Sequence, residues 1–127
     1  ELDDLLKRAD HVVILVPLTE ETKGMIGERE LSLMKKTATL ISVSRGGIVD
    51  EIALYDALKN NTIFAAGLDV FEKEPIPLEH PLLTLANVTA VPHIGSASVQ
   101  TRRAMMALNA QAIIDVLEGN EPKNRVN

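Results

Sequence analysis

Cysteine is absent from this sequence, and its absence excludes disulfides and thiolate metal sites. This composition is compatible with a reducing compartment. The chain also has no block of lysine or arginine, and its formal net charge is −5. A nucleic-acid or anionic-membrane partner needs a concentrated basic face, so both are disfavoured. The apolar runs are far shorter than the roughly 20 residues of a membrane-spanning helix. The histidines and acids lack metal-ligand spacing.

What is present is enough for one globular domain: 127 residues, of which 46% are apolar. The opening segment Glu1–Asp10 carries acids and has its apolar positions at helical spacing. This is unlike a signal or transit peptide and typical of an amphipathic helix. No strand precedes this helix, so we interpret the sequence as a fragment of a longer protein, and we expect that protein to be cytoplasmic.

Four apolar runs alternate with helical patterns and predict an α/β fold. The first run is continuous and β-branched, which is the pattern of a strand buried on both faces of a parallel sheet. The alternation favours a mostly parallel sheet with flanking helices, as in half of a doubly wound fold. The predicted strands are His11–Val16, Thr39–Val43, Ile63–Val70 and Val88–Val91.

The predicted helices are Gly27–Lys36, Asp50–Asn60 with Asp50 as its cap, and Thr101–Glu118, which either Ser96 or Ser98 can cap. The last helix has apolar positions on more than one face, which is typical of a helix buried between two bodies.

Prolines at positions 75, 77 and 81 interrupt the stretch Phe71–Leu85 and deny it both helix and sheet ladder, so we expect an irregular loop there. The last residues, Glu121–Asn127, are polar and predict a tail.

Polar residues stand at or just after the end of each predicted strand, and parallel strands bring these ends to one edge, where ligands collect. They are Thr19, Ser44, Arg45, Asp69 and His93. Arg45 precedes two glycines that let the backbone turn tightly, and its guanidinium suits a carboxylate; a plain surface arginine fits the pattern equally well. No helix follows Asp69, so accepting a hydrogen bond from a ligand amide suits it better than capping.

His93 becomes a candidate general acid if a carboxylate lies beside it, because a carboxylate stabilises and orients an imidazolium near neutral pH. The proline-rich loop offers three acids that are equally available by composition: Glu72, Glu74 and Glu79. The remaining histidines, His11 and His80, show no such arrangement.

Four segments give the chain a specific resemblance over nearly its whole length. It is similar to the D-isomer-specific 2-hydroxyacid dehydrogenase family and matches the carboxyl-terminal half of that family's nucleotide-binding domain, a Rossmann-like fold. The last two segments look most like the glyoxylate and hydroxypyruvate reductase branch. The segments are Val16–Thr19 with Thr22–Gly24, Ile41–Asp50, Ala66–Pro75, and His80–Leu83 with Pro92–Ser96.

The resemblance implies a catalytic set of Arg45, Glu74 and His93. Arg45 would bind the carboxylate and carbonyl oxygen of a 2-oxo acid. His93 would give that oxygen a proton as hydride arrives from the nicotinamide, and Glu74, which the resemblance selects by its place before Pro75, would hydrogen-bond His93 and favour its protonated form.

The resemblance also implies NAD or NADP as cofactor, a homodimer, and a small 2-oxo or 2-hydroxy acid as substrate. The lack of metal-ligand spacing predicts no metal site. Asp69 would face the nicotinamide carboxamide. The residues expected in the cofactor site are Pro17, Val43, Ser44, Arg45, Asp69, His93, Gly95 and Ser96.

Parts of the family pattern are missing. The Gly-x-Gly-x-x-Gly turn, the residue that separates NAD from NADP, and the substrate domain do not occur, so residues 1–120 would be part of a nucleotide-binding domain, followed by the tail 121–127. Two alternatives to an oxidoreductase fragment stay open. One is a dinucleotide-sensing binding module like the corepressors that share this fold, and the other is an isolated chain without activity.

Overall fold

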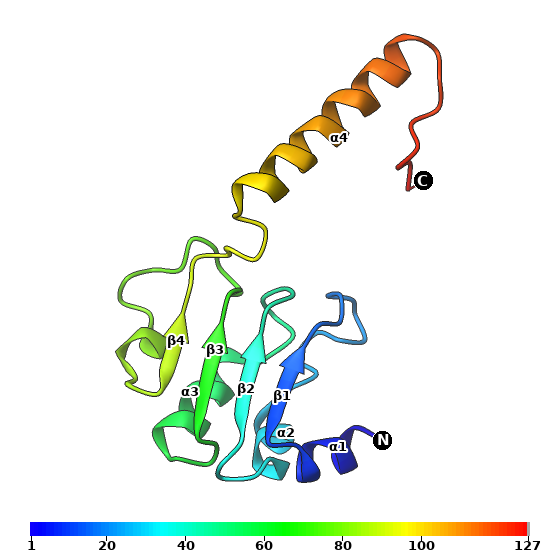
Figure 1. The fold of residues 1–127 in the computed structure, drawn as a ribbon. Helices are drawn as coiled ribbons and strands as arrows, with labels where there is room; N and C mark the ends of the chain where they lie inside the picture. The colour runs from blue at the N-terminus through cyan, green and yellow to red at the C-terminus, as the bar shows by residue number, and fades with distance from the viewer. Residues whose placement is uncertain (127) are drawn as a thin grey trace. The chain divides into compact units, whose positions relative to one another are not determined.

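The computed structural model describes residues 1–126 and contains one parallel sheet of four strands (Figure 1). The strands lie in chain order as β1 His11–Ile14, β2 Thr39–Ser42, β3 Ala65–Leu68 and β4 Val88–Ala90. The helical elements are α1 Leu2–Arg8, α2 Glu28–Leu33, α3 Glu51–Lys59, the short 3₁₀ helix η1 Pro81–Thr84, and α4 Val99–Leu117. Each neighbouring pair of strands is parallel, so the predicted sheet is confirmed.

The chain divides into two compact units, Glu1–Ile94 and the residues from Gly95 onward. The first contains the whole sheet. The second contains α4, and within it the choice between two serines is settled: Ser98 Oγ accepts the backbone N–H of Thr101 at 3.1 Å. No residue of α4 is buried, so its predicted burial between two bodies is not seen in the described chain. This unit offers α4 no second helix or strand among its described residues to pack against.

One face of the sheet forms the core of the first unit. Side chains alternate along each strand, so that Val12, Leu40 and Ala66 are buried side by side. Leucines of α1, α2 and α3 complete the same cluster. On the other face Val13 is 49% exposed. The prediction that the first strand is buried on both faces is therefore wrong for the described residues, because the helices of this unit pack on one face only.

The observed strands are shorter than the predicted ones. Apolar residues continue past β1 to Val16 and precede β3 from Ile63, but the ladder pairs only His11–Ile14 with Thr39–Ser42, and β3 begins at Ala65. The hydropathy of a sequence indicates which residues are buried, whereas the length of a strand depends on how many of its residues pair with the neighbouring strand. Residues 15–18 instead form an apolar loop beyond the end of β1.

Helix α3 starts where the sequence predicts. Asp50 Oδ1 accepts the backbone N–H groups of Ile52 and Ala53, both at 2.9 Å, and thereby satisfies donors that the first turn of a helix leaves without partners. Asn60 stands at the other end as the C-cap. The start of α3 matters for the site, because it lies beside the loop that follows β3.

The loop Phe71–Leu85 is not free of helix, as the prolines suggested. Pro81 opens η1, and proline is tolerated there because the first position of a helix needs no N–H donor. His80 caps this turn, its Nδ1 accepting the backbone N–H of Leu82 at 3.4 Å. The prediction failed because it treated a proline at the start of a turn like one in the interior.

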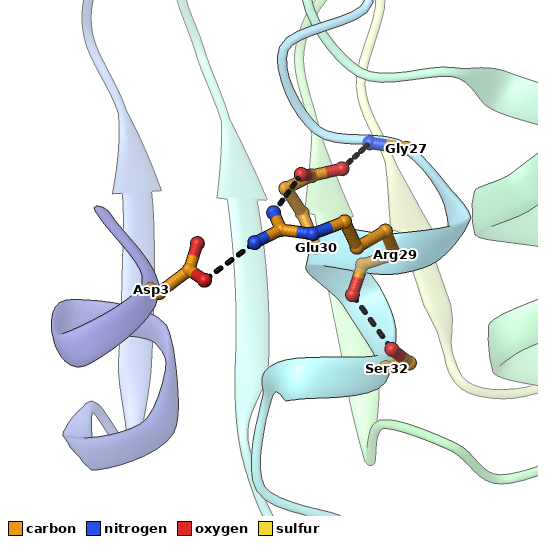
Figure 2. A network of polar contacts seen from close by, with 5 residues as sticks. All are labelled: Asp3, Gly27, Arg29, Glu30 and Ser32. Carbon is orange, nitrogen blue, oxygen red and sulfur yellow. Dashed lines mark hydrogen bonds and ion pairs between the residues drawn. The ribbon is translucent and has the colours of Figure 1, made fainter. Parts of the chain in front are cut away.

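Helices α1 and α2 are joined by a polar network (Figure 2). Arg29 donates to Asp3 of α1 and to Glu30 of its own helix, and Glu30 Oε2 accepts the backbone N–H of Gly27 at 3.2 Å. The hydrogen bond from Arg29 lowers the pKa of Glu30. The side chains of Arg29 and Asp3 are 62% and 39% exposed, so water and salt screen this pair and its contribution to stability is small.

We expect Asp50→Ala to destabilise the protein by about 1 kcal/mol, because it removes the cap of α3. The measurement is the thermal unfolding midpoint of the full-length protein. Asp56→Ala is the matched control, since Asp56 carries the same charge on the exposed face of the same helix. Equal midpoints for the two variants would contradict this role of Asp50.

Candidate active site

The loops that follow β1 to β4 gather at one edge of the sheet, because all four strands point the same way (Figure 1). This edge carries the predicted residues of the first unit. They are Pro17, Val43, Ser44, Arg45, Asp69, Glu74 and His93. Gly95 and Ser96 belong to the second unit, and their part in a cofactor site stays a prediction.

His93 and Glu74 are in direct contact. The Nδ1 atom of His93 lies 2.7 Å from Oε2 of Glu74. Of the three acids that composition left open in this loop, the structure brings Glu74 to the imidazole. With Nδ1 occupied, Nε2 is the ring nitrogen left for proton transfer, and it makes no hydrogen bond to any other described residue.

The second oxygen of Glu74 is also occupied. Its Oε1 accepts the backbone N–H of Phe71 at 3.0 Å, so the carboxylate is fixed from both sides. The hydrogen bond with His93, and after it the one from Phe71, lowers the pKa of Glu74, while partial burial and the charge of Asp69 act in the opposite direction. Glu74 is therefore ionised at neutral pH. An ionised carboxylate at Nδ1 orients the ring.

The backbone of His93 is in the left-handed region, with φ of +52°. Histidine visits this region more often than most residues with a side chain, but it is uncommon there. The following N–H group, that of Ile94, donates to Oδ1 of Asp69 at 2.6 Å. Asp69 is only 6% exposed. The buried carboxylate thus stabilises the turn that presents His93, a role that sequence reasoning missed because no spacing reveals a positive φ.

Arg45 and Glu74 come from loops that touch through their backbones. A Cβ atom on Gly46 would lie 2.0 Å from the carbonyl oxygen of Phe71 and 2.5 Å from the backbone nitrogen of Glu72. Only glycine permits this approach. The exposed Arg45 side chain donates from Nη1 to the carbonyl oxygen of Ser44 at 2.7 Å.

A hollow of about 490 Å³ opens between the loops after β1 and β2. Its lining is mostly apolar with a guanidinium and a hydroxyl: Leu15, Val16, Pro17, Leu18, Ser44 and Arg45. The hydroxyl of Ser44 is buried and has no hydrogen-bond partner among the described residues. An apolar wall beside an unsatisfied polar atom suits a flat ring that carries polar groups, as a nicotinamide does.

Both remaining histidines have partners. His80 Nε2 lies 3.1 Å from Oε2 of Glu51, and His11 Nδ1 lies 2.7 Å from the hydroxyl of Thr39. The prediction that His80 has no carboxylate beside it is therefore wrong. Glu51 comes from a helix 29 positions earlier in the chain, and no local pattern connects the two.

Within residues 1–126, no group of three or more histidines and acids is arranged to bind a metal ion. In the same part of the chain, no helix is long and apolar enough to cross a membrane.

Comparison with known proteins identifies the family. Residues 1–95 match the model described as "D-isomer specific 2-hydroxyacid dehydrogenase, NAD binding domain". The chain belongs to this family. Glyoxylate/hydroxypyruvate reductase B of Enterobacter sp. (strain 638) is 51% identical over 127 residues, which are all of this chain and 39% of that protein. The same enzyme of Salmonella newport (strain SL254) is 50% identical over the same shares. The chain thus spans about 39% of the length of these curated relatives.

Solved structures have the same fold, and several of them are described as D-isomer specific 2-hydroxyacid dehydrogenases. A crystal structure of a protein from Thermus thermophilus superposes with a TM-score of 0.95 at 44% identity, covering 99% of this chain and 40% of that one. The NADPH-dependent glyoxylate/hydroxypyruvate reductase of Sinorhizobium meliloti gives a TM-score of 0.91 at 39% identity, covering 99% of this chain and 39% of that one. These likenesses confirm the predicted Rossmann-like, partial doubly wound fold and the predicted family.

We expect Gly46→Ala to destabilise the protein by roughly 1–3 kcal/mol, because the new Cβ would overlap the backbone of Phe71. The measurement is the thermal unfolding midpoint of the full-length protein. Gly67→Ala is the control, since its Cβ would meet Ile41 at an ordinary 3.8 Å. A melting point for Gly46→Ala as high as that of the control would show that the loops after β2 and β3 can move apart without loss of stability.

The lowered pKa of Glu74 predicts a pH-dependent stability. A carboxyl group with a depressed pKa stabilises the folded state above its ordinary value of 4.5, and this stabilisation is lost as the pH falls below that value. The melting point of the wild type should therefore exceed that of Glu74→Gln at pH 7, and the difference should shrink below pH 4.5. The exposed Glu79→Gln serves as the control. A difference that stays constant down to pH 3.5 would refute the linkage.

Proposed function

We propose that the full-length protein reduces a small 2-oxo acid of the glyoxylate or hydroxypyruvate type to the D-2-hydroxy acid. The observation that carries this proposal is the His93–Glu74 pair at the carboxyl edge of the sheet, with Nδ1 of His93 at 2.7 Å from the carboxylate and Nε2 left for chemistry. Relatives that are named glyoxylate/hydroxypyruvate reductase B and are about half identical to this chain support the same substrate class.

Arg45, His93 and Glu74 have separate roles in the proposed reaction. Arg45 binds the substrate carboxylate and carbonyl oxygen through its guanidinium, whose planar donors match two oxygens. When a nicotinamide cofactor is bound at this edge, its chemistry would be to supply hydride for the carbonyl carbon. The imidazolium of His93 gives its Nε2 proton to the carbonyl oxygen, which becomes the hydroxyl. Glu74 stays ionised throughout and stabilises the charged ring before transfer; in the reverse direction His93 takes the proton back.

The cofactor in this proposal is NAD or NADP. The matching family model is described as an NAD binding domain, and the Sinorhizobium meliloti relative is described as NADPH-dependent. The residues that would line the cofactor site are Pro17, Val43, Ser44, Arg45, Asp69, His93, Gly95 and Ser96. Support comes from the apolar hollow after β1 and β2 and from the unsatisfied hydroxyl of Ser44.

The proposal includes a homodimer in the cytoplasm. Apolar side chains of α4 are well exposed, among them Met106 at 69% and Ile113 at 62%, and a second copy of the chain would remove such surface from water. The absence of cysteine agrees with a reducing compartment.

We expect His93→Asn to lower the rate of glyoxylate reduction by the full-length protein by about 10²–10⁴-fold, the usual contribution of a positioned general acid. Asparagine accepts a positive φ as histidine does, so this variant removes the acid while preserving the backbone. Consumption of NADH and NADPH, each followed by absorbance, measures the rate.

His11→Asn is the control, because it makes the same replacement at a histidine of β1 far from the carboxyl edge. Retention of the wild-type rate by His93→Asn would refute the assignment. A wild-type protein that binds dinucleotide but turns over no 2-oxo acid would instead favour the dinucleotide-sensing module.

A further inference from the structure

We propose that Glu51, at the first position of α3, is a positioning residue for the Glu74–His93 pair and acts through the loop after β3. The inference rests on the proposed function, since it concerns the same imidazole. Its basis is a second histidine–carboxylate contact, between Glu51 and His80, which lies outside the pair itself and is connected to it by hydrogen bonds.

Glu51 uses both of its carboxylate oxygens on this loop. Oε1 accepts the backbone N–H of Glu72 at 2.7 Å, and Oε2 lies 3.1 Å from Nε2 of His80. The Glu51 and His80 side chains are 17% and 21% exposed, so water competes weakly for these contacts. One carboxylate therefore fixes both ends of the segment 72–80, in which Glu74 lies.

The tautomer of His80 follows from its second contact. Its Nδ1 accepts the backbone N–H of Leu82 at 3.4 Å, so in the neutral ring the proton is on Nε2 and is donated to Glu51. The ring also packs edge-on against Phe71, with centroids 6.2 Å apart. A carboxylate at position 51 fits this arrangement, whereas an amide would offer its N–H₂ group to the protonated Nε2 or lose its contact with Glu72.

The connection to the catalytic pair is short. Glu72, whose N–H Glu51 accepts, follows Phe71, and the N–H of Phe71 donates to Oε1 of Glu74. The other oxygen of Glu74 contacts His93. Residues 72–75 are exposed, so apolar packing does not determine their position. Hydrogen bonds to carboxylates determine it instead, and Glu51 provides the one that comes from a helix.

A positioning role makes a prediction that a purely structural role does not. If Glu51 acts by placing Glu74, its removal should matter only while Glu74 is present. Residues that act as a unit show such non-additivity, whereas independent contributions multiply. The alkaline limb of the pH–rate profile provides a second readout, because a misplaced carboxylate stabilises the imidazolium less.

The test uses the full-length protein and measures kcat and KM for glyoxylate across pH, together with the melting point. We expect Glu51→Gln to lower kcat roughly tenfold, below the about hundredfold loss that a 1 Å misplacement can cause. Its alkaline limb should move to lower pH, with KM little changed. Glu74→Gln should lower kcat further, and the double variant should match Glu74→Gln within about twofold. His80→Asn, which keeps a cap for Leu82, should shift kcat and the limb as Glu51→Gln does.

Glu79→Gln is the matched control, because it removes the same charge from an exposed position of the same loop, and it should behave as the wild type. Independent, multiplying effects of Glu51→Gln and Glu74→Gln would overturn the inference. So would a lowered melting point for Glu51→Gln with kcat and the pH profile unchanged. Failure of the proposed function looks different: Glu74→Gln itself would then keep the wild-type kcat.

Discussion

The carboxyl edge of the sheet depends on one backbone contact, between Gly46 after β2 and Phe71 after β3. Nothing larger than hydrogen fits on Gly46, since a Cβ would lie 2.0 Å from the Phe71 carbonyl oxygen. Side chains can rotate away from a crowded neighbour, but a peptide group cannot, so this contact sets the separation of the two loops almost rigidly. Arg45 precedes the contact on one loop and Glu74 follows it on the other. The same backbone contact therefore sets the positions of Arg45, which is proposed to bind the substrate, and Glu74, which is proposed to orient the proton donor.

Three carboxylates accept backbone N–H groups of these loops, as the carbonyl groups of neighbouring strands accept N–H groups within the sheet. Glu51 accepts the N–H of Glu72, Glu74 accepts that of Phe71, and Asp69 accepts that of Ile94. Backbone donors beyond the end of a strand need partners, and a charged acceptor makes a shorter and stronger hydrogen bond than a neutral one. Each donor N–H group belongs to a residue within three positions of Glu74 or His93 along the chain. The acids at this edge therefore hold the loop backbone in place as well as supplying negative charge.

The fold was largely predictable from the sequence because it depends on patterns that repeat along the chain, whereas the site was predictable only in part. Apolar runs separated by helical spacing indicated the four strands and α3 with its Asp50 cap. Strand ends, the one-sided burial of the sheet and the turn η1 depend on which backbone runs alongside or which layer covers a face, and local hydropathy records neither. At the site, composition left three acids equal, and only a family resemblance singled out Glu74. The contact of Asp69 with Ile94 occurs in a turn where His93 has a positive φ, and a positive φ leaves no trace in residue spacing.

Under the proposed function, the charged side chains at the carboxyl edge balance one another and the substrate. Asp69 and Glu74 bring two negative charges to the edge, and Arg45 with a protonated His93 brings two positive ones. A 2-oxo acid adds one negative charge, which the guanidinium can meet directly while the imidazolium faces the carbonyl oxygen. The proton from Nε2 neutralises the negative oxygen that hydride addition creates. A bound nicotinamide that gives up hydride would gain the positive charge that the imidazolium loses, so the total charge does not change during the step. Glu74 must stay ionised for this to hold, and the hydrogen bonds from His93 and Phe71 that lower its pKa secure that condition.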